Sequence, residues 1–415
     1  MRAYREILSV PGALKFCAAG LLARSGGAMM GLGIVLMVSA LYGSYGLAGA
    51  LAAANGLAWA IGTAVLSNLV DRYGQRRVMY PAVVVSATML AVVVVFALLR
   101  LPAWTLFAPI VISGATGGAP GALVRTRWNH VLDDPDRLHT AFALESTLDE
   151  LTFVIGPVAA TALSVGVHPV AGLVAPIVLS LVGAKLFYDQ RETEPPPHPR
   201  EPADGAVAIW RRLILLVPGV AAVVAVNVLI GSMFGAIDVS VVAAATSWDA
   251  RAASGVILGL FSTASGLAGF WFGSRTWAGV ASKRFLVGVL AMFAAAALLP
   301  LASTVVLLGA IGMLFGATVA PTLITANTVL EKLVPTGRLT EGLSWMGTGL
   351  GIGVSIGSSV SGNLIDASGY HSGLLAVAVF GAVAALVAAL SYKTVRRHAH
   401  PEPSEFASPR SAETA

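Results

Sequence analysis

Five charged side chains lie inside long apolar stretches of the sequence. Arg24 stands about ten residues into the first apolar run, and Asp238 is the only acid in a long run of the second half. Glu145, Asp149 and Glu150 occur together in ALESTLDELTFVIGP. An arginine at the centre of a hydrocarbon layer costs roughly 2.5–3.5 kcal/mol on insertion scales, so such residues usually balance one another or serve a function. The chemistry open to them is charge pairing, binding of a polar ligand and carriage of a proton.

The spacing of the three neighbouring acids decides which of them share a surface. Residues four apart lie on the same face of a helix, so Glu145 and Asp149 face one way and Glu150 is turned by about 100°. Glu145 is nearer the end of its apolar run, and we expect it to reach water. Asp149 and Glu150 lie deeper, where a charge without a partner is costly.

The elements that carry these residues are apolar segments of helical length. Of the 415 residues, 56% are apolar and only 11% are charged, which is typical of a membrane protein. About 20 apolar residues cross a hydrocarbon core of roughly 30 Å as a helix, and a helix satisfies its own backbone there. The sequence predicts an all-α integral membrane protein with twelve transmembrane helices. They are expected at 14–42, 46–68, 78–99, 103–124, 139–164, 170–188, 212–243, 254–274, 284–302, 304–328, 340–363 and 372–392.

The basic residues indicate how these spans are oriented. With both termini inside, Arg100 and Arg251 are the only basic residues outside, and Arg24 lies within a span. The other 23 of the 26 lysines and arginines then fall on the inner side. This bias favours an even number of spans with both termini cytoplasmic. The basic residues are scattered beside apolar runs, so we expect no nucleic-acid partner.

Two polar segments divide the sequence. Residues 189–211 begin DQRETEPPPHPREPADG and predict a flexible cytoplasmic linker, while residues 393–415 predict a disordered tail. They separate a six-helix bundle at 1–188 from a second at 212–392. Cys17 is the only cysteine, so we expect no disulfide, no metal site and no cofactor.

The two predicted bundles share short patterns in the same order. GATGGAP at 114–120 returns as GATVAP at 316–321. In each half Arg-Leu follows 17 residues after the proline, at Arg137 and at Arg338. The common order and near-constant offset favour a duplicated six-helix unit. Two such repeats, with a binding site near the midplane between them, are typical of secondary transporters.

A charged loop between the second and third predicted spans, residues 67–77, reads SNLVDRYGQRR. Its pattern D-R-x-G-x-R-R is made by Asp71, Arg72, Gly74, Arg76 and Arg77. On these residues and the repeats, the chain resembles transporters of the major facilitator superfamily, which carry this loop between their second and third helices. The resemblance implies two pseudo-symmetric bundles of six helices.

The resemblance also implies a role for the loop. In the family, the acid at the position of Asp71 sits near the positive end of a helix of the other bundle and helps to latch the outward-facing state. An acid in that place gains roughly 0.3–1 kcal/mol. The alternative is a solvated turn, in which Gly74 permits the bend and the arginines hold the cytoplasmic side. The corresponding loop of the second half lacks the acid, so we expect a one-sided latch.

Gly156 and Pro157 resemble the centre of the antiporter motif of the same family. Glycine allows close helix packing and proline opens the backbone hydrogen-bond ladder, which predicts a helix hinge. The match is partial. In addition, the arginine that many antiporters carry within the fourth span is missing, because Arg125 and Arg127 fall at the predicted cytoplasmic end. The motif favours an exporter and leaves its proton coupling open.

The helix arrangement of the family implies partners for the buried charges. Its first and fifth helices are neighbours, so we expect Arg24 to pair with Asp149 or Glu150, leaving the other acid free to change protonation. A static ion pair is the alternative. Its first and seventh helices line the cavity, so Asp238, with Asn227 on the same helix, is expected to bind substrate or carry a proton. The alternative for Asp238 is a cap on a local helix break.

These patterns predict a secondary transporter that works by alternating access, with Glu145 and the residues above on its substrate or proton pathway. Arginine exceeds lysine by 21 to 5, which favours a GC-rich bacterium. We expect a monomer in the inner membrane that exports a small organic molecule in exchange for protons. An importer of a sugar or other metabolite is the near alternative. A polytopic membrane enzyme or a transport-dead sensor has less support, because no phosphate loop or nucleophile motif is found.

Overall fold

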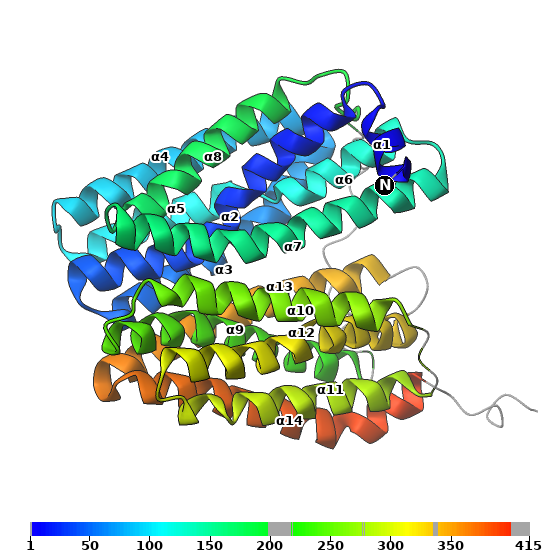
Figure 1. The fold of residues 1–415 in the computed structure, drawn as a ribbon. Helices are drawn as coiled ribbons and strands as arrows, with labels where there is room; N and C mark the ends of the chain where they lie inside the picture. Colours follow the sequence, from blue (N-terminus) through cyan, green and yellow to red (C-terminus); the bar gives the residue numbers. More distant parts are fainter. Residues whose placement is uncertain are drawn as a thin grey trace, which may run out of the picture.

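The computed structural model describes residues 2–197, 217, 219–275, 277, 279–334 and 339–399. Every regular element in this part of the chain is a helix (Figure 1). The first half contains α1 (Arg2–Leu8), α2 (Ala13–Tyr42), α3 (Tyr45–Tyr73), α4 (Gln75–Leu98), η1 (Ala103–Leu106), α5 (Phe107–Gly117), α6 (Pro120–Val131), α7 (Pro135–Gly166) and α8 (Ala171–Tyr188). The second half contains α9 (Val220–Ser247), α10 (Ala253–Gly273), α11 (Ala281–Ala296), η4 (Leu299–Leu301), α12 (Val305–Leu333), α13 (Leu339–Ser368) and α14 (Tyr370–Ala399).

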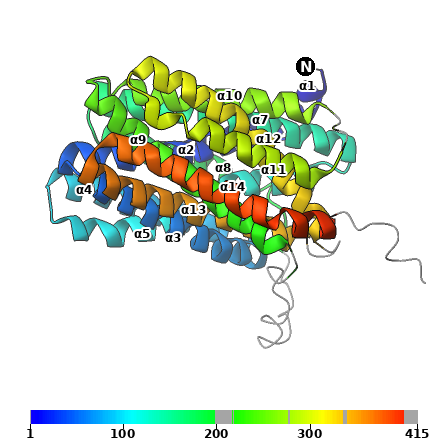
Figure 2. The same cartoon turned by 90° about the horizontal axis from the view of Figure 1, so that it is seen from below.

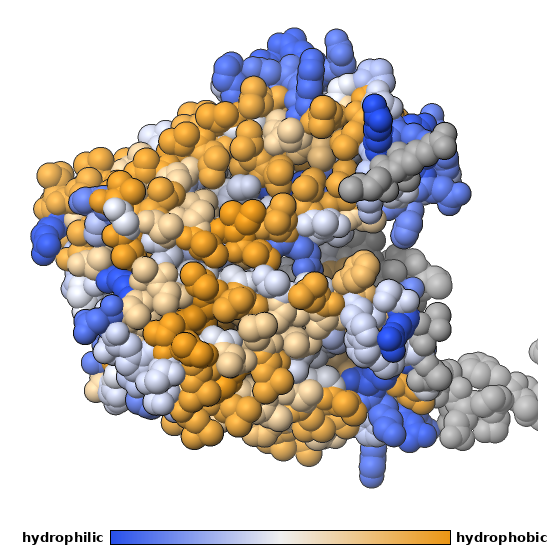
Figure 3. Space-filling model, in the orientation of Figure 1, coloured by the Kyte–Doolittle hydropathy of each residue, from blue (hydrophilic) through white to orange (hydrophobic). Residues whose placement is uncertain are grey.

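Most of these helices are long and apolar enough to cross a membrane. Eleven segments of the described chain meet that condition, with η1, α5 and α6 taken together as one. α13 is a further helix of 30 residues, rich in glycine and serine, that packs against both α3 and α9. Apolar side chains cover most of the lateral surface, and polar ones gather toward the two ends (Figure 3). The predicted all-α fold of twelve spans is confirmed.

The predicted end of the linker and the predicted start of the tail differ from the structure. α9 begins at Val220 rather than at 212. α14 continues to Ala399, so the disorder predicted from 393 was wrong as far as that residue. Arg396 and Arg397 stand in its last turn, where positive charge favours a helix end. The rest of the predicted tail, and the predicted linker from 198 to 211, lie outside the described residues.

The helices form two bundles, α1 to α8 and α9 to α14, that lie side by side (Figure 1). The N-terminus, the loop between α3 and α4 and the end of α14 lie at one end, which we call the terminal face. The opposite end is the distal face. The bundles meet chiefly along two helix pairs, α3 with α13 and α7 with α10 (Figures 1 and 2).

Glycines bring both helix pairs into close contact toward the distal face. A Cβ atom at Gly49 of α3 would stand 2.1 Å from the carbonyl oxygen of Ser358 on α13. A Cβ at Gly255 of α10 would stand 2.6 Å from the carbonyl oxygen of Pro157 on α7. Toward the terminal face the bundles diverge (Figure 1), and the surface between them is recessed there (Figure 3).

Asp366, near the end of α13, ties the two bundles together at the distal face. Its carboxylate accepts hydrogen bonds from the hydroxyl of Ser44 at 2.6 Å and from the backbone N–H groups of Tyr45 and Gly46, each at 2.8 Å. Ser44 is the N-cap of α3, so an acid of one bundle lies on the positive helix end of the other.

Arg251 forms a second tie at the same face. It lies in the loop after α9 and donates to the carbonyl of Leu36 at 2.8 Å and to Oγ of Ser39 at 2.6 Å, both on α2. Together the Asp366 and Arg251 contacts, which we call the distal clasp, close the distal face while the terminal face stays open.

The fourth span is broken in its middle, whereas the sequence predicted one helix over 103–124. α5 ends at Gly117, and Gly118 takes φ 67° and ψ −168°, a conformation that only glycine adopts readily. The indole N–H of Trp59 donates to the carbonyl of Gly118 at 2.7 Å, which satisfies part of the open backbone. α6 then restarts at Pro120. The repeat copy in α12 has one residue fewer and stays continuous through Pro321.

Candidate substrate and proton pathway

Four charged side chains from three helices meet inside the first bundle. Arg24 of α2 forms ion pairs with both Glu145 and Asp149, which share one face of α7. Nη1 of Arg24 lies 2.9 Å from Oδ1 of Asp149. Nη2 of Arg125, on α6, lies 2.7 Å from the other oxygen, Oδ2, of Asp149. We call these four residues the charged network; its two positive and two negative charges cancel.

Glu145 is the enclosed end of the network. Its side chain is 0% exposed, so the expectation that it reaches water was wrong. Two helices cover it: the indole N–H of Trp128 on α6 donates at 2.8 Å, and the thiol of Cys17 on α2 donates at 3.2 Å. With an arginine and two neutral donors around it, this carboxylate is fixed, which suits a positioning role.

Asp149 and Arg125 form the open end. Their side chains are 29% and 33% exposed, against 7% for Arg24. Beside Arg24 on α2, Gly27 and Gly31 are exposed, and a Cβ atom at either would meet no atom within 4 Å. Residues 24, 27 and 31 share a helix face. The network therefore borders open space, with Asp149 as the acid that a ligand or a proton can reach.

Arg125 is the residue that the sequence analysis missed. It was placed at the end of the fourth span, but α6 runs on to Val131, so the span does contain an internal arginine. A boundary drawn by hydropathy stops where charges begin, and it therefore assigns to water any charge that is buried near a helix end. The signal was the position of Arg125 one residue beyond the predicted boundary.

Glu150 does not join the network. It is turned toward α10, where a Cβ atom at Gly266 would stand 2.0 Å from its Oε2. The side chain is exposed, and it makes no hydrogen bond or ion pair with any residue that the structure describes. Of the two partners considered for Arg24, Asp149 is the one that binds it, and Glu150 lies on the seam between the bundles.

Asp238 lies partly buried on α9 of the second bundle. Within the described chain its carboxylate has no hydrogen-bond or ion-pair partner. One turn earlier on the same face, Phe234 contacts Phe261 of α10, with ring centroids 6.2 Å apart. α9 continues without interruption from Val220 to Ser247, so the helix break that Asp238 was alternatively expected to cap is not present there.

Asn227 holds two helices of the second bundle together. It is 3% exposed, and its amide donates to the backbone carbonyl of Met346 on α13. The structure therefore places Asn227 in a helix contact rather than beside the open space, and Asp238 remains the polar residue of α9 without such a role.

Among the described residues, the hydrogen bonds and ion pairs of the loop at 67–77 go to its own bundle and to the start of the linker. Asp71 is exposed and makes no hydrogen bond or ion pair with a described residue of the second bundle. Gly74 takes φ 90°, and the guanidinium of Arg72 lies 5.2 Å from the ring centroid of Tyr73. The backbone N–H of Arg76 donates to Glu194 at 2.9 Å. The latch expected of Asp71 is therefore not engaged while the terminal face is open.

Gly156 and Pro157 lie where α7 packs between α2 of its own bundle and α10 of the second bundle. A Cβ atom at Gly156 would lie 3.0 Å from Cβ of Ala28 on α2, and the carbonyl of Pro157 packs on Gly255 of α10. α7 is continuous across the pair. The hinge remains a prediction.

The fold resembles those of solved transporters at low sequence identity. A nucleoside transporter, NupG, superposes with a TM-score of 0.70 at 14% identity over 92% of this chain and 98% of the other. The POT family transporter PepTSo gives a TM-score of 0.71 at 12% identity over 93% and 98% of the two chains. An auto-inhibited POT family peptide transporter gives 0.70 at 12% identity over 93% and 97%. These likenesses show the shared fold alone.

Sequence comparison identifies the family. A search of curated proteins gave no match. The family model described as Major Facilitator Superfamily matches residues 16–274 and 220–414, which together span nearly the whole chain. With two six-helix bundles in contact along α3–α13 and α7–α10, this protein belongs to the major facilitator superfamily of transporters.

Proposed function

We propose that this protein is a proton-coupled exporter that carries a small organic molecule by alternating access. Membership of a transporter family supports secondary transport in a multi-pass membrane protein. The observation that carries the finer proposal is the charged network. Its enclosed end holds a fixed carboxylate, while its open end places Asp149 and Arg125 beside the space between the bundles. A charged side chain is costly inside a membrane, so charges that border a ligand-accessible space usually serve the function of the protein.

The two ends of the molecule support the alternating cycle. In the state described, the distal clasp is closed and the loop of Asp71 is disengaged. In the opposite state the clasp opens, the terminal face closes and Asp71 meets the second bundle. Each face then has its own acid-based contact, and a near-balanced equilibrium between the two needs only a few kcal/mol of differential binding to shift.

Under this proposal the acids have different roles in substrate binding and proton transfer. Asp149 exchanges its arginine partners for a polar group of the substrate, with Arg125 as the mobile partner and Arg24 anchored by Glu145. Asp238 has no ionic partner in the described chain, which suits an acid that gains and loses a proton between the two states. Glu150, on the seam at Gly266, is a second candidate for the proton.

The test is transport by purified protein in liposomes with an imposed pH gradient, across a panel of organic cations, nucleosides and short peptides. Asp149→Asn is expected to reduce transport of the accepted compound at least tenfold. Asp238→Asn is expected to keep exchange but lose its dependence on the gradient. Glu331→Gln changes an exposed acid at the end of α12 and is the matched control, with unchanged rates expected.

Two outcomes separate the alternatives. If a protonophore leaves transport unchanged, proton coupling is wrong and a uniporter remains. If the proton gradient drives the compound in the same direction as the proton, the protein is an importer, the second candidate. The importer is kept because solved structures of the same fold include nucleoside and peptide transporters. Normal transport by Asp149→Asn would remove the charged network from the pathway.

A further inference from the structure

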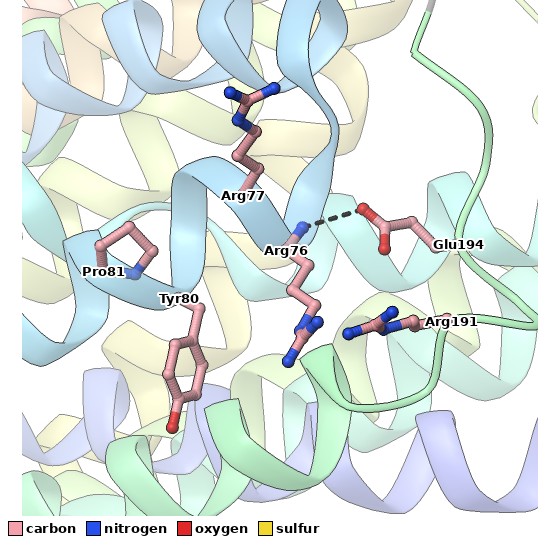
Figure 4. A pocket seen from close by; sticks show the side chains of 6 residues that line it. All are labelled: Arg76, Arg77, Tyr80, Pro81, Arg191 and Glu194. Atoms are coloured by element: carbon pink, nitrogen blue, oxygen red, sulfur yellow. Dashed lines mark hydrogen bonds between the residues drawn. The ribbon is translucent and has the colours of Figure 1, made fainter.

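A pocket on the outer side of the first bundle carries positive charge that lies outside the charged network. Arg76, Arg77 and Arg191 line it with Glu194 and Tyr80, and its volume is about 480 Å³, within the roughly 300–1,000 Å³ of small-molecule sites. Figure 4 shows the guanidinium groups of Arg76 and Arg191 extending into the same space, with Tyr80 beside it. The three arginines outnumber the one acid of the lining.

Hydrogen bonds and a stacking contact hold the wall of this pocket in position. Residues 189–194 form one side, and Arg127, which is 0% exposed, holds them by donating to the carbonyl of Gln190 and to Oγ1 of Thr193, each at 2.9 Å. The guanidinium of Arg127 stacks over the ring of Phe187 at 3.9 Å from the centroid. Glu194 is fixed by the backbone N–H of Arg76 at 2.9 Å. The arginines are thus presented on a fixed frame.

The nearby acids neutralise only part of the pocket's charge. Asp189 is shared between two basic side chains: it lies 3.1 Å from Nζ of Lys185 and, at a longer distance of 3.6 Å, from the guanidinium of Arg76. The guanidinium of Arg191 has no acid within ion-pair distance among the described residues. Two arginines that extend into one space repel each other unless an anion lies between them, and planar guanidinium groups suit the oxygens of a phosphate.

The surroundings favour a lipid over a soluble anion. The pocket lies at the terminal-face ends of α4 and α8, which pack on each other and make no extensive contact with the second bundle in the described chain. Beyond it, exposed apolar side chains continue along both helices toward the distal face, Val84 and Val85 on α4 and Val182 and Leu186 on α8. Tyrosine beside a basic pocket at the end of a membrane span is typical of the headgroup level.

We infer that this pocket binds the phosphate of an anionic phospholipid, with the acyl chains lying along α4 and α8. The site is separate from the charged network, so its test does not depend on transport. Arg76 belongs to the loop at 67–77, and a bound headgroup would hold the beginning of α4 in the position described.

The experiment titrates short-chain phosphatidylglycerol into detergent-solubilised full-length protein and follows the melting temperature. Saturable stabilisation is expected with phosphatidylglycerol and not with phosphatidylcholine of the same chain length. Arg76→Gln with Arg191→Gln is expected to weaken the apparent Kd at least tenfold. The backbone bond from Arg76 to Glu194 survives that change. Arg137→Gln with Arg396→Gln removes the same charge from exposed sites of the same face and is expected to stay within twofold of the wild type.

Three results would overturn the assignment: equal affinity of the Arg76/Arg191 variant, equal stabilisation by phosphatidylcholine, or equal protection by inorganic phosphate at the same concentration, which would make it a soluble anion site. The melting temperature without lipid reports whether the double variant folds. If it does not, the single change Arg191→Gln, which removes no ion pair of the described structure, decides the question, with a loss of affinity expected and an unchanged Kd contradicting the site.

Discussion

Glu145 and Arg24 show how a buried charge is kept in place. The carboxylate is sealed behind Trp128 and Cys17, and its one ionic partner is Arg24. Breaking a buried pair from one side strands the other charge, which costs about 3–5 kcal/mol, whereas removing both charges is often neutral. The pair is therefore a sensitive element of stability as well as the anchor of the charged network.

Arg24→Leu is expected to lower the free energy of unfolding by about 3–5 kcal/mol, because Glu145 is left charged and enclosed. Adding Glu145→Gln to that variant is expected to restore most of the loss. The measurement is reversible unfolding in mixed micelles for the two single variants and the double. Additive losses in the double variant would show that the two side chains do not depend on each other.

Arg125→Gln is expected to behave differently. Arg125 and Asp149 are both about a third exposed, and a pair that reaches water contributes little to stability, roughly 0–1 kcal/mol. We expect an unchanged melting temperature and a fall in transport of at least tenfold. Arg137→Gln, at an exposed position of α7, is the control. A variant of Arg125 that transports normally would remove it from the pathway.

At this scale the sequence predicted a pair between Arg24 and Asp149 but not the depth of the other two acids: Glu145, expected to reach water, is enclosed, and Glu150, expected to lie deep, is exposed. The spacing of Glu145 and Asp149 was sufficient to place both on one face. It did not reveal that Trp128 closes over Glu145 or that Arg125 reaches Asp149, because both contacts come from α6. The backbone break at Gly118 and Ala119 precedes that helix and sets where it begins.

At the scale of helices, the length of each apolar segment predicts that it spans the membrane. The glycines then set how closely neighbouring helices approach. Each predicted segment overlaps an observed helix, and the largest differences are the late start of α9, the extensions of α6 and α14 and the break in the fourth span. The break could have been suspected from Gly117-Gly118-Ala119-Pro120, since the second copy of the motif lacks one residue and has no break.

Gly49→Ala is expected to open the seam between α3 and α13. The added Cβ would stand 2.1 Å from a backbone oxygen, a contact that no side-chain rotation relieves. The distal-closed state should lose population. In a Ser359→Cys background, which places a cysteine of α13 at this seam, thiol reagents applied from the distal side should react faster. Gly273→Ala is the control, because a Cβ there meets no atom within 4 Å. Equal labelling of the two variants would mean that the seam does not open.

At the scale of the whole molecule, the distal clasp holds the state described. Asp366→Asn removes the charge from three hydrogen bonds to α3. A loss of about 1–2 kcal/mol changes a two-state ratio roughly 5–30-fold. We expect the terminal face to close more often and the distal face to open. Asp249→Asn, an exposed acid at the same face, should leave the ratio unchanged, and an equal ratio in both variants would contradict the clasp.

The sequence did not predict this clasp, because it joins residues more than 200 positions apart in different bundles. Asp366 and Arg251 each stand at a span end, where a charge is ordinary. Only the docking of the two bundles makes them partners. The family resemblance drew attention to Asp71 at the other face, which makes no hydrogen bond or ion pair with the second bundle in the part of the chain that the structure describes.

The most direct test of alternating access measures both faces of one protein by double electron–electron resonance. One spin-label pair replaces Leu69 of α3 and Leu343 of α13 at the terminal face, and another replaces Trp104 and Leu375 at the distal face, all of them exposed. Cys17 is 5% exposed and stays unlabelled. Asp366→Asn is expected to shorten the terminal distance and lengthen the distal one together. Distances that stay single and unchanged at both faces would contradict the account.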